Sequence, residues 1–286
     1  MEEENIINTS NLKYSVIKPL YKTKCGELLL VSNKSNENDN ILYIMKCIKV
    51  KSKEEKEMIL KEVKKLKELN SKYILKIHDF FVQNDEKNEL ICLILDYSEE
   101  HKSLYELIYN SYFLTLQNIW RIFIKSLIGI NSIHKANILI INLNPQNIII
   151  DKEKNIKITG FGNILDLAKE ELDNNLYNSP EVINEKKFDN KSDMWSLGCI
   201  LYEMVCKRKI FENVKDIINI NYKIPEKIIP NITTVIEKLI CKHDNIFEAD
   251  KMIYTPIIKK KILEENLFLE IIQNNYEGKK INIYNF

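Results

Sequence analysis

The order of the apolar segments is the feature that most constrains the fold of this chain. Residues 12–50 hold short apolar runs, such as "ELLLVSN" and "ILYIMKCIKV", which polar turns separate and which favour strands. The segment "KSKEEKEMILKEVKKLKELN" then places apolar residues three or four positions apart, which predicts one amphipathic helix. Two further strands follow, "YILKIHDFF" and "ELICLILDY". The first part of the chain is therefore predicted to be a strand-rich unit that holds one helix.

The pattern changes to helix from about residue 98. The segments "SLYELIYNSY" and "LQNIWRIFIKSLIGINSIH" predict helices, short strands are expected at 147–150 and 155–158, and helices return from Ser192 to the end. We therefore predict an α+β chain with a small β-rich lobe at 1–96 and a larger helical lobe at 97–286.

Composition excludes several classes of partner and location. With 45% hydrophobic and 29% charged residues, the 286-residue chain can bury one large core or two modest ones. A net charge of +1 gives no reason to expect nucleic acid or an anionic membrane as a partner. No signal peptide or apolar membrane span is visible, and the six scattered cysteines, without a CxxC, are typical of reduced thiols. We expect a cytoplasmic or nuclear protein.

A series of motifs in a fixed order resembles the eukaryotic protein kinases over almost the whole chain, as one domain at roughly 12–270. In chain order these motifs are "YIMKCI", "LKEVKKLKEL", "LILDYS", "INLNPQNIII", "IKITGFG", "LYNSPEVI" and "KSDMWSLGCILYEM". The spacing within "LNPQN" is closer to that of serine/threonine kinases than to that of tyrosine kinases. The resemblance implies a bilobal kinase-like fold.

The resemblance implies a set of nucleotide-binding positions. Lys46 corresponds to the lysine that positions ATP, and Glu62 to the glutamate that pairs with it. Two simpler interpretations stay open, because a lysine on a strand is usually just solvated and Glu62 can pair with Lys65 one turn along its helix. The remaining positions that the resemblance assigns to nucleotide are Leu28, Ile44, Asp96, Ser98, Asn147 and Ile149.

The groups that perform phosphoryl transfer are missing from the corresponding positions. The catalytic aspartate is replaced by Asn142, which has neither useful basicity nor negative charge. The lysine two positions later is Asn144, and the metal-binding aspartate of the DFG segment is Gly160. Asn147 is the one retained candidate metal ligand, and a single neutral oxygen is a poor site for magnesium. We expect no catalytic residue and no bound magnesium.

The phosphate-covering loop is also altered. The chain has 6 glycines, and "LYKTKCGELL" carries Tyr21 and Thr23 where the resemblance places glycines. Side chains there hinder the approach of backbone amides to phosphate. Ile44 replaces a smaller residue over the adenine position. No cofactor is expected to be required, and any ATP binding is expected to be weak.

Regulation by phosphorylation is not expected, whereas scaffold positions are kept. Ile141 stands where an arginine would receive a phosphate, and "NILDLAKEELDNNL", after Gly162, holds no Ser, Thr or Tyr. Asp193 is expected to brace the catalytic-loop backbone. The resemblance also implies an apolar column whose members are Leu66, Ile77, Ile140 and Phe161.

One structural pair is altered. Glu181 would normally pair with an arginine, and that position is Glu248. We therefore expect either another cation near Glu181, with Lys242 as the candidate, or a shifted local arrangement.

Three functions are compatible with these observations. The sequence favours a pseudokinase that binds or regulates a protein partner, such as an active kinase. An atypical serine/threonine kinase, which would use Asn147 and an unassigned carboxylate, is the alternative. A decaying duplicate without a selected function is the third, against which the intact "SDMWSLG" motif argues.

Overall fold

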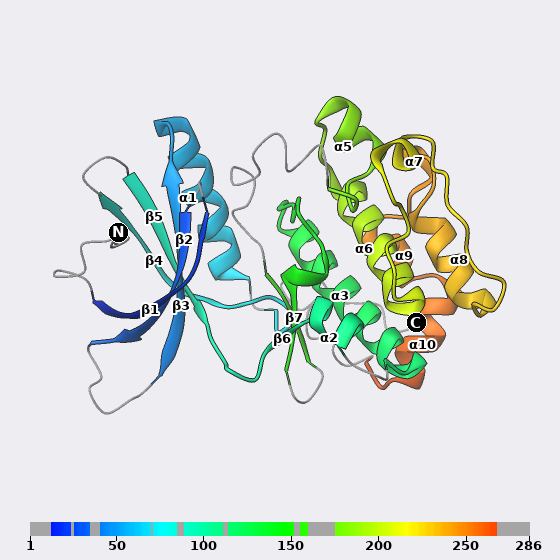
Figure 1. Ribbon diagram of the computed structural model, residues 1–286, viewed down its shortest axis with the longest axis horizontal. Helices are drawn as coiled ribbons and strands as arrows, with labels where there is room; N and C mark the ends of the chain where they lie inside the picture. The colour runs from blue at the N-terminus through cyan, green and yellow to red at the C-terminus, as the bar shows by residue number, and fades with distance from the viewer. Residues whose placement is uncertain are drawn as a thin grey trace. The chain divides into compact units, whose positions relative to one another are not determined.

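The computed structural model describes residues 13–23, 26–34, 41–69, 71–84, 89–110, 114–151, 155–159 and 175–267 (Figure 1). The described residues divide into two compact units. The first comprises those within Met1–Glu68 and Leu75–His101, and the second those within Leu69–Ile74 and Lys102–Phe286.

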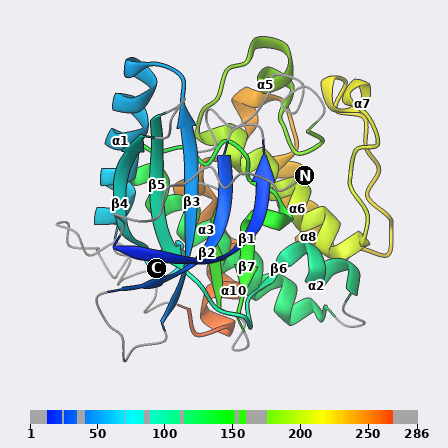
Figure 2. The same ribbon diagram turned by 60° about the vertical axis from the view of Figure 1, so that its left-hand side comes forward.

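The first unit is a five-stranded antiparallel sheet with one helix. The sheet order is β1-β2-β3-β5-β4, and α1 packs over β4 and β3 (Figure 2). The elements are β1 (Tyr14–Thr23), β2 (Gly26–Asn33), β3 (Leu42–Val50), α1 (Lys53–Glu68), β4 (Ile77–Asn84) and β5 (Glu89–Asp96). The strand-rich unit with one helix that the sequence predicted is thus confirmed.

The sheet buries a cluster of apolar side chains on alternating positions, as period-two packing requires. The cluster includes Met45, Cys47 and Cys92, all at most 2% exposed. Cys47 and Cys92 lie opposite each other on β3 and β5, with 3.6 Å between their Sγ atoms. Every cysteine within the described ranges is a free thiol. The hydrogen bond with Cys92 and burial raise the pKa of Cys47.

Helix α1 has the predicted amphipathic pattern. Ile59, Val63 and Leu66 are buried, while charged residues cover the opposite face. The helix begins with a reciprocal cap, in which Ser52 Oγ accepts from the Glu55 backbone N–H at 3.2 Å and Glu55 Oε2 accepts from the Ser52 N–H at 3.1 Å. Such a capping box satisfies two N–H groups that the helix cannot pair internally.

The second unit is mainly helical. Its α3 and α6 are buried along almost their whole length, which explains their mostly apolar sequences. Its elements are β6 (Lys102–Ser103), α2 (Leu104–Asn110), α3 (Leu116–Lys135), η1 (Pro145–Asn147), β7 (Ile148–Ile150), β8 (Ile156–Ile158), α5 (Pro180–Glu185), α6 (Asn190–Cys206), α7 (Val214–Ile218), α8 (Pro230–Leu239), η2 (His243–Asn245), α9 (Ala249–Ile253) and α10 (Pro256–Glu264). Strands β6, β7 and β8 form a small antiparallel sheet.

Close packing of α6 explains part of its sequence. A Cβ atom on Gly198 would lie 2.7 Å from Leu239 Cβ of α8, so only glycine fits there. Trp195 is fully buried and stacks on Phe211, with 5.7 Å between the ring centroids. In the part of the chain that the structure describes, every helix is too short or too polar to span a bilayer.

Two sequence-based boundaries were wrong. The strand expected from Tyr73 begins at Ile77, because Ile74 forms a parallel bridge with Ile158 and belongs to the second unit. The helices of the second unit resume before Ser192, since α5 starts at Pro180 and Asp189 caps α6. Proline at the first helical position and aspartate at an N-cap are ordinary start signals that the apolar pattern alone did not reveal.

Candidate functional site

A buried carboxylate holds the loop that corresponds to the catalytic loop. Asp193 of α6 is 2% exposed and accepts from the backbone N–H groups of Ile140 and Ile141, both at 3.0 Å. Its Oδ2 also lies 2.9 Å from Nε2 of the buried His134 of α3. The carboxylate is therefore fully engaged by donors, as buried charge requires. This is the bracing role that the sequence predicted for Asp193.

The brace supports an unusual backbone turn. Ile141 has a φ of 66°, in the left-handed region that a β-branched residue rarely adopts. The Asn142 N–H donates to Ile140 O at 2.8 Å, which closes a three-residue γ-turn around Ile141. Such a turn costs free energy for isoleucine. The two hydrogen bonds from the Ile140 and Ile141 N–H groups to Asp193 stabilise the backbone in this conformation.

Four asparagine side chains form a network on this turn. Asn142 Oδ1 accepts from Asn144 Nδ2 and from Asn175 Nδ2, both at 3.0 Å. The backbone carbonyl of Asn142 accepts from Asn144 Nδ2 at 3.1 Å and from Asn147 Nδ2 at 2.8 Å. The oxygen at the position of the catalytic carboxylate is thus occupied by two amide donors of the same unit.

Asn144 also starts the short helix after the turn. Its Oδ1 accepts from the backbone N–H groups of Gln146 at 2.9 Å and Asn147 at 3.3 Å, and Pro145 is the first residue of η1. Asparagine at an N-cap followed by proline is a favoured local arrangement. The side chain of Asn144 therefore has a structural task that a lysine could not perform in the same way.

The described part of this loop does not fit a divalent cation. Asn142, Asn144 and Asn147 are neutral, and Mg²⁺ prefers carboxylate and phosphate oxygens. Across the described ranges, no group of three or more His, Cys, Asp or Glu side chains could hold a metal ion. Gly160, which the resemblance places where the metal-binding aspartate would stand, lies outside the described residues. The described side chains of this loop therefore provide no basis for magnesium-dependent chemistry.

The nucleotide positions of the first unit include three neighbours on one face of the sheet. Leu28 of β2 lies opposite Lys46 of β3, and Ile44 stands two residues before Lys46 on the same strand. All three are half-buried, whereas Met45 and Cys47 between and beside them point into the core. The roles predicted for Tyr21 and Thr23 depend on their side chains, which are not among those that the structure describes.

Glu62 has an unusual environment for the partner of a lysine. Burial raises its pKa to about 7, although the charges of Lys65 and Lys46 act in the opposite direction. Its Oε1 is buried without a hydrogen-bond partner among the described residues. The two lysines weighed as partners both influence Glu62 electrostatically, and neither compensates fully for its burial.

Asp96 and Ser98 already take part in local contacts of the first unit. Asp96 Oδ1 is in short contact with His78 Nε2, and its backbone N–H donates to Lys76 O at 3.3 Å. Ser98 Oγ accepts from the Glu100 N–H at 3.3 Å. The side chains of both residues are therefore already partly engaged within the first unit.

The remaining predicted positions lie in the second unit or outside the description. Asn147 ends η1, and Ile149 in the middle of β7 is half-buried and pairs with Ser103 and Lys157. Leu66, Ile77 and Ile140 of the predicted apolar column are buried, each in its own unit, and Phe161 is not described. The nucleotide assignments therefore stay predictions.

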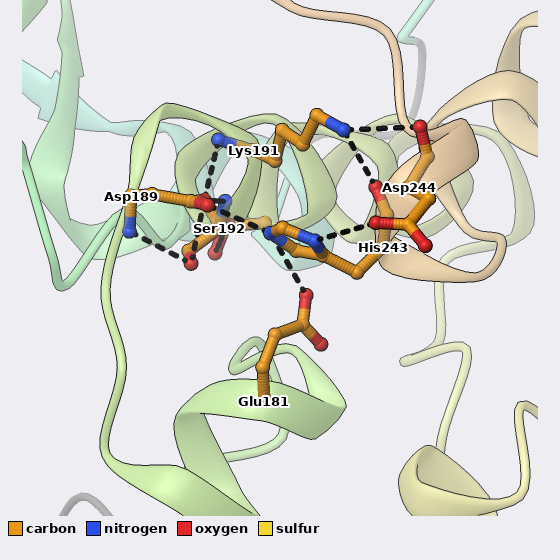
Figure 3. Close-up of polar contacts among 7 residues, drawn as sticks. Glu181, Asp189, Lys191, Ser192, His243 and Asp244 are labelled. Atoms are coloured by element: carbon orange, nitrogen blue, oxygen red, sulfur yellow. Dashed lines mark hydrogen bonds and ion pairs between the residues drawn. The ribbon is translucent and has the colours of Figure 1, made fainter.

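The side chain that faces Glu181 differs from the one expected. His243 Nε2 lies 3.9 Å from Glu181 Oε1 and 2.7 Å from Asp189 Oδ2 (Figure 3). Lys242 is exposed, and Glu248 pairs with Lys251 at 3.7 Å. The expectation of Lys242 was wrong, because Lys242 N-caps η2 and the next residue places its ring toward α5.

Two groups of polar contacts at the segment before α5 were not expected from the sequence. Asn175 binds Asn142 and also caps a turn by accepting from the Tyr177 N–H at 3.0 Å. The fully buried Glu203 accepts from the hydroxyls of Tyr177 and Tyr109, both at 2.6 Å. Tertiary contacts of this kind leave no periodic signal in the sequence.

Comparisons with known proteins agree with this architecture. Residues 25–265 match the family described as Protein kinase domain. The chain is 28% identical over 259 residues to serine/threonine-protein kinase Nek11 of Macaca fascicularis, which covers 82% of this chain and 39% of that protein. It is 31% identical over 201 residues to calcium-dependent protein kinase 4 of Plasmodium falciparum, which covers 67% and 37%, respectively.

The chain belongs to the protein kinase family, because the family match extends over most of its length. Its α+β architecture, with a strand-rich first unit and a helical second unit, is that of the family. The chain spans about two fifths of the length of the curated relatives it matches.

Proposed function

We propose that this protein is a pseudokinase, a protein with the kinase fold that binds and regulates a protein partner, such as an active kinase, instead of transferring phosphate. The observation that carries the proposal is the state of Asn142. Its Oδ1 occupies the catalytic position and accepts from Asn144 and Asn175. The side chain at the catalytic position is therefore engaged by neighbouring residues of the same unit.

Phosphoryl transfer depends on positioning and on neutralising charge, so neutral groups at this loop remove most of its basis. An amide cannot accept the proton of an attacking hydroxyl at neutral pH. Asn144 carries no charge to steady the transferred group and is engaged with η1. Two adjacent charge losses, each worth orders of magnitude in rate, support catalytic silence.

A weak, magnesium-independent nucleotide site is the second part of the proposal. Lys46 is present on β3, and Leu28 and Ile44 stand on the same face of the sheet. Glu62, with its pKa raised to about 7, is only partly ionised at neutral pH and would hold Lys46 weakly. ATP would therefore bind through few contacts and without a metal.

The alternative is an active serine/threonine kinase. The names of the relatives and the retained Asn147 favour it. It requires a carboxylate that reaches the transferred phosphate, which the described loop does not provide.

A transfer assay separates the two functions. Purified protein with labelled ATP and magnesium or manganese is compared with the Lys46→Met variant on itself and on generic protein substrates. The pseudokinase proposal predicts equal background for both proteins. Transfer by the wild type that disappears in Lys46→Met would overturn it.

A further inference from the structure

Three elements of the second unit meet at the imidazole of His243. The ring belongs to η2, and around it lie Glu181 in the first turn of α5 and Asp189 at the N-cap of α6 (Figure 3). Its Nε2 is the atom nearest to both carboxylates, 2.7 Å from Asp189 Oδ2 and 3.9 Å from Glu181 Oε1.

The backbone under the ring is held independently of the imidazole. Lys191 Nζ donates to the carbonyls of His243 and Asp244, both at 3.0 Å. The Ile246 N–H donates to His243 O at 3.1 Å. The ring is therefore held close to α5 and α6 whether or not it carries a charge.

Asp189 divides its two oxygens between two tasks. Its Oδ1 accepts from the backbone N–H groups of Lys191 at 2.9 Å and Ser192 at 3.1 Å, and its Oδ2 faces His243. Burial alone would raise the pKa of Asp189, but the hydrogen bonds from His243 and from these N–H groups outweigh it and lower the pKa. The anionic form of Asp189 is thus favoured beside the ring.

Glu181 is less well satisfied. Its side chain is only 13% exposed, and Oε1 has no hydrogen-bond partner in the described part of the chain. The single Nε2–H lies closest to Asp189, so only the positive charge of a protonated imidazole can compensate Glu181. An unpaired carboxylate oxygen that is buried costs free energy, whereas a cation beside it offsets that cost.

Carboxylates face the ring from three elements of the second unit. Carboxylates come from α5 (Glu181), from the cap of α6 (Asp189) and from η2 itself, where Asp244 Oδ1 lies 3.7 Å from Nδ1. The ammonium of Lys191 is engaged with carbonyls. A hollow of about 350 Å³ beside the ring is lined by residues of both signs, Glu181, Glu185, Lys187 and Lys242. The pKa of the neighbouring Cys241 thiol is raised by burial, so this thiol adds no anion at neutral pH.

We propose that His243 is a proton-dependent tie that holds α5 against α6 and η2. In the protonated state the imidazolium attracts Glu181 and Asp189 together. In the neutral state it keeps Asp189 and leaves Glu181 buried without compensation. The tie depends on that proton, so it is stronger at acidic pH than at alkaline pH.

The tie bears on the catalytic loop through the residues just before α5. Asn175 donates to Asn142, and Ser196 Oγ of α6 donates to Tyr177 O at 2.8 Å. Loss of the tie is expected to increase the opening of α5 and of these contacts. This consequence holds whether or not the protein transfers phosphate.

A double-mutant cycle tests the tie. The melting temperatures of the wild type, Glu181→Gln, His243→Gln and the double variant are measured at pH 5.5 and pH 8.5. We expect a coupling of about 2–4 °C at pH 5.5, the shift that one such interaction gives in a domain of this size, and less than about 1 °C at pH 8.5. Other titrating groups occur in all four proteins, so they cancel in the cycle. Equal couplings at both pH values, or none at either, would overturn the proposal.

A variant with a permanent charge gives a second test. His243→Arg is expected to keep the stability of α5 at pH 8.5, measured as hydrogen-exchange protection of the Ile183 and Lys186 amides, which bond within this helix. In the wild type, protection of these amides, corrected for intrinsic exchange, is expected to fall between pH 5.5 and 8.5 while α3 keeps its protection. Unchanged α5 protection in the wild type would contradict the tie even if a variant failed to fold.

Discussion

The brace formed by Asp193 and the loop that it supports differ in charge. Asp193 is buried, ionic and bound to three donors, whereas the half-buried loop above it carries three neutral asparagines. Side-chain hydrogen bonds hold both regions, but only the brace has a charged group at a position that the family resemblance identifies. The difference shows that the charge of this region lies in the contact that fixes the loop backbone, and that the three asparagine side chains of the loop carry none.

The largest expected effect follows from removing the brace. Asp193→Ala leaves the N–H groups of Ile140 and Ile141 and the His134 ring without their acceptor. Breaking a buried charged network in this way costs about 3–5 kcal/mol. Denaturant unfolding followed by circular dichroism measures the loss. A cost below about 1 kcal/mol would mean that the strained turn at Ile141 is held by other contacts.

The pH dependence of stability gives the next largest effect. The folded-state pKa of Glu62 is about 7 against an ordinary 4.5, so its protonated form is favoured in the folded state. That contribution is fully present below about pH 4.5 and is lost as the pH rises through 7. Glu62→Gln removes the titration and is expected to stabilise the protein at pH 8, by up to about 3 kcal/mol.

The control for this measurement lies on the same helix. Glu57→Gln changes an exposed carboxylate of α1 and is expected to leave the pH profile of stability as it is in the wild type. Unfolding curves from pH 4.5 to 8.5 for the three proteins make the comparison. If Glu57→Gln and Glu62→Gln gave the same profile, the buried position of Glu62 would have no energetic consequence.

A smaller loss is expected at the cap of η1. Asn144→Ala removes the acceptor for the Gln146 and Asn147 N–H groups and one donor to Asn142. Loss of an N-cap costs about 1 kcal/mol. Asn144→Asp keeps the acceptor and serves as the matched variant in thermal melts. If the two variants melted together, below the wild type, the cap would not be the reason for the loss.

The smallest effect concerns the catalytic position. A carboxylate at residue 142 can accept from the same donors, so Asn142→Asp is expected to change stability by less than about 1 kcal/mol. It is also expected to restore no measurable transfer, because groups that act as a unit are non-additive.

The triple variant Asn142→Asp, Asn144→Lys, Gly160→Asp is expected to bind nucleotide better. Its turnover is expected to stay far below the roughly 1–100 per second of kinases. Robust turnover in a radiolabel assay would show that the other substitutions matter little.

The sequence predicted most of the fold but only part of the site. The periodicity of α1 and the apolar runs of β2, β3 and β5 indicated their elements directly, because local pattern and tertiary burial agree there. The prediction that Lys242 is the partner of Glu181 was wrong, because the turn that starts η2 decides whether Lys242 or His243 faces α5. The contact of Asn175 with Asn142 joins residues 33 positions apart and has no local signal.

The most direct test of the central claim is whether magnesium affects nucleotide binding. Wild-type protein is melted with increasing ATP in the presence of either magnesium or a chelator. A ligand at 100 times its dissociation constant stabilises by about 2.7 kcal/mol, so even weak binding is visible at millimolar ATP. The account predicts a small shift in melting temperature that is the same under both conditions. A large shift that appears only with magnesium would contradict it.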